Sequence, residues 1–205
     1  MNRGRVNCCD CEEDYIKPRP EKKEPKCKPH HQTETILKCG TAAGSAPLTC
    51  NSIALNGVGS NGYGFQPIVQ ATVVIDTTPL LHPTVKIDFS SLISFKTCDD
   101  DNYFLRLAFK LSKICGGGPI PLGTWTFERV SNECNGPEVA QFSGCDFVKG
   151  TDAFGFNWCE CEDCPDCCRY IVEIVEQQCY NIEYVAVSNI SLTAMAVGLK
   201  KSDHY

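Results

Sequence analysis

Five cysteines crowd into ten residues late in the chain, and cysteine can ligate metal, act as a nucleophile or form disulfides. They are Cys159, Cys161, Cys164, Cys167 and Cys168. The C-x₂-C-x₂-C spacing within this group is typical of an iron–sulfur ligand run, but Arg169 replaces the fourth cysteine expected after it. Carboxylates between the cysteines also oppose thiolate formation. The pattern favours disulfides in a Cys-rich loop over 159–168, and zinc bound by four thiolates is the alternative.

A second group of cysteines, Cys8, Cys9 and Cys11, lies near the start of the chain. Adjacent cysteines rarely bond each other, because the short distance between their Cα atoms strains the bridge. Each of Cys8 and Cys9 therefore needs a distant partner, and on an extended arm that partner can belong to another molecule. A tail of free thiols is the simpler reading, and the residues alone leave it open.

The other motifs do not assemble a catalytic set. Residues 57–62 match G-x-G-x-x-G, but the sequence that follows cannot begin the helix that a dinucleotide phosphate needs. The four histidines lie in the arm, beside Pro83 and at the end of the chain. We expect no enzymatic activity, no cofactor and no bound metal.

Composition narrows the class of protein further. The 205 residues include 16 cysteines and carry a formal net charge of −6, with no basic stripe for nucleic acid. No apolar run is long enough to span a membrane, and the first residues lack the apolar core of a signal peptide. We therefore expect neither a nucleic acid nor a membrane as partner. So many cysteines are typical of an oxidising compartment, whereas the first residues do not predict export. Either the thiols bind metal, or the protein meets oxidant by another route, such as release when its cell lyses.

The chain divides into two parts that position these cysteines, an N-terminal arm and a β-rich domain. Residues 1–34 combine mixed charges with several prolines, a composition that favours an extended arm without a core of its own. From residue 35 to 205, short β-rich runs alternate with turn residues. Apolar and polar residues alternate from Val85 to Phe89 and from Leu105 to Leu111, which indicates strands with one buried face. The same alternation of apolar and polar residues continues at Trp125 and Phe127.

The pattern predicts an all-β fold, a jelly-roll-like β-sandwich of about eight strands with an extended N-terminal arm. Further strands are expected over 68–75, 170–175 and 184–197. The last of these changes phase near Asn189, which predicts either a bulge or a strand that passes from one sheet to the other.

This arrangement resembles known spore proteins. A Cys8-Cys9 arm, the run Ile36-Leu-Lys-Cys39-Gly40 opening an all-β domain, the run Thr124-Trp-Thr-Phe127 and the late Cys-Glu-Cys-Glu-x-Cys cluster are similar to small cysteine-rich proteins of clostridial spore-formers. They also resemble the endospore appendage (Ena) subunits of Bacillus relatives. The longer Pro/Lys arm and the cluster at 159–168 depart from the appendage pattern.

The resemblance implies a structural subunit of an extracellular fibre on the endospore surface. Jelly-roll subunits would polymerise with copies of themselves, and N-terminal arms would couple them by disulfides and strand addition. It implies Cys8, Cys9 and Cys11 as donors and Cys39 and Cys179 as acceptors, with a spore-coat or exosporium protein as candidate anchor. The alternatives are a cysteine-rich metal-binding protein and a carbohydrate-binding jelly roll.

Overall fold

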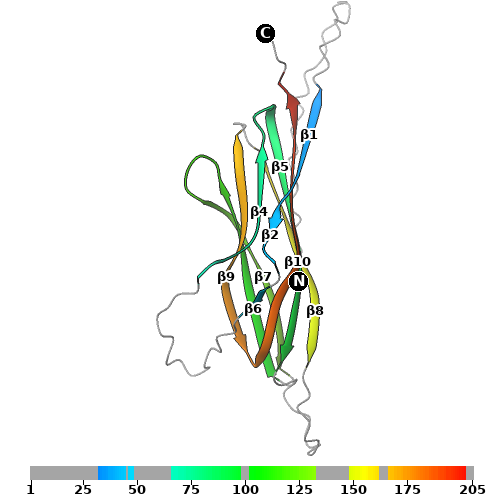
Figure 1. Cartoon of the computed structure of the whole chain (residues 1–205), viewed down its shortest axis with the longest axis vertical. Helices are drawn as coiled ribbons and strands as arrows, with labels where there is room; N and C mark the ends of the chain where they lie inside the picture. Colours follow the sequence, from blue (N-terminus) through cyan, green and yellow to red (C-terminus); the bar gives the residue numbers. More distant parts are fainter. Residues whose placement is uncertain are drawn as a thin grey trace, which may run out of the picture.

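Two β-sheets pack face to face along the long axis of the molecule (Figure 1). The structure is a computed structural model, and it describes residues 32–44, 46–48, 66–97, 102–132, 148–161 and 166–201. All secondary structure within these ranges is β-strand. The all-β prediction is therefore confirmed.

Within these described ranges, ten strands make up the two sheets. The first five are β1 (Thr33–Cys39), β2 (Thr41–Ala42), β3 (Ala46–Leu48), β4 (Ile68–Asp76) and β5 (Leu80–Thr97). The others are β6 (Asn102–Ile114), β7 (Ile120–Asn132), β8 (Lys149–Cys161), β9 (Cys167–Tyr180) and β10 (Ile182–Lys200).

Their order is that of a jelly roll. One sheet runs β1-β10-β5-β8, with β3 also paired to β10, and we call it sheet A. The other, sheet B, runs β2-β4-β9-β6-β7. Every pairing between the described strands is antiparallel, and among the long strands only β6 and β7 follow each other within one sheet. The remaining connections cross between the sheets, which produces the two interlocked Greek keys of the predicted fold.

The core lies between the sheets and follows the alternation of the sequence. Val85, Ile87 and Phe89 of β5 face Leu105, Leu107 and other apolar side chains of β6, all of them 3% exposed or less. Phe127 is also buried, whereas Trp125 is only partly covered. The predicted inward set is thus confirmed, because period two places every second residue on the dry face.

Two local features of the strands refine the sequence predictions. The phase change in β10 is a bulge: the pairing with β5 shifts between Ser188 and Ser191, and Asn189 has a φ of 49°. Both halves of β10 stay in sheet A, so the strand does not change sheets. The loop predicted over 159–168 is shorter than expected, because β8 extends to Cys161 and β9 begins at Cys167.

Candidate functional site

The cysteine-rich end of the sandwich contains a disulfide between the end of β6 and the start of β9. Cys115 bonds Cys168, with 4.5 Å between their Cα atoms and 53 positions between them in the chain. The pairing of Ile114 with Arg169 brings the two residues opposite each other in sheet B. A loop of this length corresponds to roughly 4 kcal/mol of stabilisation in the chain-entropy description of disulfides. Cys168, expected in a disulfide within the 159–168 cluster, is thus bonded outside it.

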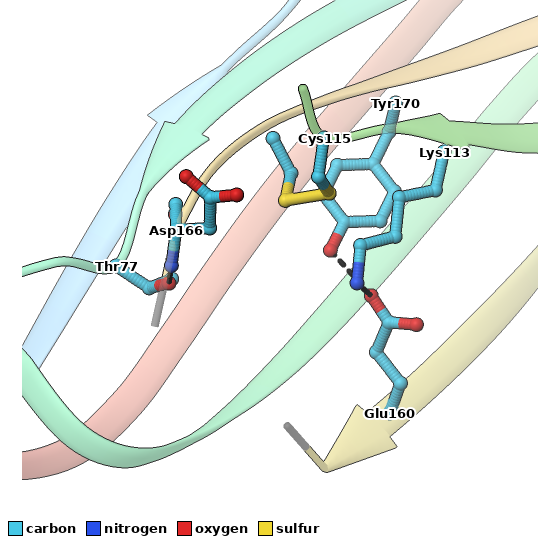
Figure 2. Close-up of polar contacts among 7 residues, drawn as sticks. Thr77, Lys113, Cys115, Glu160, Asp166 and Tyr170 are labelled. Carbon is cyan, nitrogen blue, oxygen red and sulfur yellow. Dashed lines mark hydrogen bonds and ion pairs between the residues drawn. A yellow bond between two sulfur atoms is a disulfide. The ribbon is translucent and has the colours of Figure 1, made fainter. Parts of the chain in front are cut away.

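Beside this disulfide lies a group of three polar side chains, Lys113, Glu160 and Tyr170, which we call the triad (Figure 2). Lys113 Nζ lies 3.1 Å from Glu160 Oε1, and the Tyr170 hydroxyl donates a hydrogen bond of 2.5 Å to the same oxygen. The Tyr170 ring is fully buried. Burial first, and the hydrogen bond to Glu160 second, raise the pKa of the Tyr170 phenol far above its usual value of 10.0.

The remaining described cysteines of the late cluster are thiols at strand ends. Cys159 and Cys161 belong to β8, and Cys167 opens β9. Cys161 and Cys167 are exposed, and the Cys161 sulfur lies 3.7 Å from the Thr84 hydroxyl on the outer face of sheet A. Cys164 lies outside the described residues. Within the ranges that the structure describes, no three His, Cys, Asp or Glu side chains are grouped to hold a metal ion.

The two candidate acceptors differ in accessibility. Cys39 ends β1 as an exposed thiol. Cys179 is 2% exposed and already disulfide-bonded. An oxidant such as oxygen can join an incoming thiol to the free thiol of Cys39, whereas at Cys179 an incoming thiolate would have to displace the existing disulfide partner. The donors Cys8, Cys9 and Cys11 lie outside the described residues.

The edge of the sandwich formed by β7 and β8 is closed by matched side chains, which we call the β7–β8 ladder. Trp125 stacks on Phe156 with ring centroids 3.9 Å apart, and Phe127 meets Phe154 edge-on at 6.1 Å. The next pair is ionic: Arg129 Nε donates to Asp152 Oδ2 at 2.9 Å. This bond is the main cause that lowers the pKa of Asp152 below 3.8. Every second side chain of β7 over 125–129 therefore contacts every second side chain of β8 over 152–156.

Among the described strands, β8 ends sheet A and pairs along one side only, with β5, over its 13 residues. An edge strand presents unpaired N–H and C=O groups to any strand that approaches. The outer face beside it carries a shallow polar hollow of about 420 Å³, lined among others by Asp88, Asn157 and Thr193. Thr193 is the register partner of Cys39, so an exposed thiol lies next to this hollow.

The sequence pattern did not predict the Cys115–Cys168 bond or the triad. A signal for the triad was present: the odd-numbered inward positions of β6 continue through Leu111 to Lys113, so a lysine falls on the dry face. A lysine at such a position requires a partner of opposite charge. In β8, Glu160 likewise continues the series Phe154, Phe156 and Trp158.

Comparison with known families assigns the domain but not an activity. The family model described as "Domain of unknown function (DUF4489)" matches residues 33–197. No curated protein matches the chain. The described residues include no helix of the length and apolarity that a membrane span requires. The family match begins at the first residue of β1 and ends within β10.

Proposed function

This chain belongs to the DUF4489 family over residues 33–197, and from that premise we propose that it is a structural subunit of an extracellular fibre at the endospore surface. Successive subunits add strands at the sheet edges, and N-terminal arms link them by disulfides. The observation that carries the proposal is the edge strand β8, whose 13 residues have no strand partner on their outer side within the part of the chain that the structure describes.

The ladder supports β8 as an assembly edge. Trp125 and Phe127 pack behind Phe156 and Phe154, so β8 is held in place before any neighbour arrives. A strand that is already ordered loses little conformational freedom when another strand pairs with it. Strand addition at this edge then forms backbone hydrogen bonds at a small entropic cost.

The arm supplies the covalent link in this proposal. Its Pro/Lys stretch, residues 17–29, reaches about 40 Å when extended at about 3.1 Å per residue. That distance is enough to carry Cys8 and Cys9 to a neighbouring subunit. Cys39 is the preferred acceptor of the two that the resemblance implies, because its thiol is exposed while the sulfur of Cys179 is bonded.

An arm that binds a different surface from the one it leaves makes the contact head-to-tail. Such contacts produce open filaments when the rotation between subunits does not close a ring. Release from lysed cells would expose the thiols to oxidant, which suits a chain with 16 cysteines. The spore surface, and an anchor protein of the coat or exosporium, follow from the same resemblance.

Replacement of single cysteines tests the acceptor. Cys39→Ser should abolish the covalent multimers seen on a non-reducing gel, whereas Cys167→Ser should leave them in place. Both thiols are exposed, but only Cys39 is proposed to receive the arm. Loss of multimers in Cys167→Ser and their persistence in Cys39→Ser would refute this assignment.

The polar hollow on sheet A favours carbohydrate binding as a second candidate function. Asp88, Asn157 and Thr193 offer hydrogen-bonding groups of the kind that bind sugar hydroxyls. Glycan-array binding that disappears in Asp88→Ala would support this candidate. An array without binding would leave the fibre subunit as the proposed function.

A further inference from the structure

Within the triad, Lys113 and Glu160 form the most enclosed ion pair that the described residues contain. The Lys113 and Glu160 side chains are 10% and 15% exposed. A second Lys–Glu pair, Lys110 with Glu173, connects β6 to β9 at a similar distance of 3.0 Å, but its side chains are 30% and 22% exposed. The two pairs share residue types and a strand, so burial and surroundings distinguish them.

The strands hold the triad from both sheets. Lys113 and Tyr170 are register partners on the inner face of sheet B. Glu160 pairs with the buried Val85 and so faces them from sheet A. The Cys115–Cys168 bond lies two residues from both Lys113 and Tyr170 and ties their strands together (Figure 2). The amine and the carboxyl group are therefore presented to each other by a rigid frame.

We propose that Lys113 and Glu160 condense into an amide bond between the two sheets. One proton passes from the Lys113 ammonium to the Glu160 carboxylate. The Nζ lone pair then attacks Cδ, and a C–N bond forms as the bond from Cδ to Oε2 breaks. Oε2 leaves as water with two protons, one transferred from lysine and one released by Nζ on amide formation. No oxidant or other co-reactant enters, and one water is the only product released.

Geometry supplies what this reaction lacks in solution. Lys113 Nζ lies 3.1 Å from Oε1 of the carboxyl group whose Cδ it would attack. Groups held in a reactive orientation react with effective molarities of about 10⁵ M or more, which favours condensation over the separated amine and acid. The Tyr170 hydroxyl donates to Oε1, the oxygen that becomes negative in the tetrahedral intermediate. Burial limits the access of water, which would otherwise hydrolyse the product.

Such a bond would resist reductant. It joins β6 to β8 across the core, whereas Cys115–Cys168 joins β6 to β9 within one sheet. The inference does not depend on the proposed fibre, because the reaction takes place inside one chain. It can hold or fail whether or not the protein polymerises.

Peptide mapping of the purified full-length protein tests the inference. Trypsin separates residues 111–129, with missed cleavage at Lys113, from residues 150–169. Because the disulfide joins the same two peptides, the protein is first reduced and alkylated under denaturing conditions. We expect one branched peptide, lighter by one water than its two parts combined, and an intact chain lighter by the same mass. Separate peptides, with cleavage at Lys113 and the full sequence mass, would overturn the proposal.

Three variants identify the reacting groups. Lys113→Arg keeps the positive charge but has no nucleophilic amine, and it should give separate peptides. The matched variant Lys110→Arg should retain the branched peptide. Tyr170→Phe should slow formation of the bond in newly synthesised protein by at least tenfold. A branched peptide in Lys113→Arg would overturn the assignment, and an unchanged rate in Tyr170→Phe would overturn the role of the phenol.

Discussion

The two lateral sides of the sandwich, where the edge strands of the two sheets meet, are closed in different ways. On the side of β7 and β8, side chains from both sheets meet in the β7–β8 ladder. On the opposite side, the chain itself crosses from β1 in sheet A to β2 in sheet B through Gly40. The Gly40 amide donates to Leu192 O at 2.7 Å, which ties the crossing backbone to β10.

This difference determines what each side can offer a neighbour. That side of the molecule is bordered by β1 with seven residues, β3 with three and β2 with two, all shorter than β7 and β8. The ladder leaves β7 and β8 as edge strands of 13 residues each. Long edges give strand addition the most hydrogen bonds, and two unlike sides favour a head-to-tail contact.

Truncating the ladder should have the largest effect on stability. Phe156→Ala removes a ring that stacks on Trp125 and Phe89, and we expect a loss of about 3–5 kcal/mol in the free energy of unfolding. Ile36→Ala on β1, only partly buried, is the control and should cost less. Urea unfolding measures both, and equal losses would show that the two sides depend on side-chain packing alike.

The crossing should be sensitive to a single methyl group. A Cβ added at Gly40 would lie 2.6 Å from Thr72 O and 3.0 Å from Leu192 O, both backbone atoms that cannot move aside freely. We expect Gly40→Ala to lower stability by about 1–3 kcal/mol. Gly44→Ala, where a Cβ meets nothing within 4 Å, is the matched control. Thermal unfolding at the same temperature for both variants would contradict a tight crossing.

Acid should weaken the ionic step of the ladder, with the smallest effect. The folded pKa of Asp152 lies below 3.8, mainly because Arg129 donates a hydrogen bond to it. This stabilisation is fully present above about pH 3.8 and is lost as pH falls through the lower folded value. In acid titrations followed by tryptophan fluorescence, Asp152→Asn should show a shallower loss of stability than wild type. Identical curves for the two proteins would remove Asp152 from the ladder.

The sequence predicts the sides of the sandwich unequally. Strict alternation identified β5 and β6, and with them the inward Phe89 and Leu107, because period two is visible in one strand at a time. Partners across the core are not local, so Trp125 gave no sign that it would stack on Phe156. Because of its cysteines, the segment 159–168 was predicted to be a loop, and the alternation of β8 up to Glu160 was therefore not recognised.

The Cys115–Cys168 disulfide also could not be predicted from local sequence. Cys115 and Cys168 lie 53 positions apart, and only the register of β6 with β9 makes them neighbours. Spacing within the late cluster therefore could not identify the partner of Cys168. Local order is encoded in short stretches of sequence, whereas pairing depends on topology.

Removal of the arm tests the central claim most directly. Full-length protein, a variant without residues 1–16, and the double variant Cys8→Ser with Cys9→Ser are imaged by negative-stain electron microscopy after oxidation and again after boiling in detergent. We expect fibres that survive boiling from the full-length chain, none from the deletion, and fibres that fall apart in hot detergent from the double variant. Normal, boiling-resistant fibres from the deletion would contradict the account.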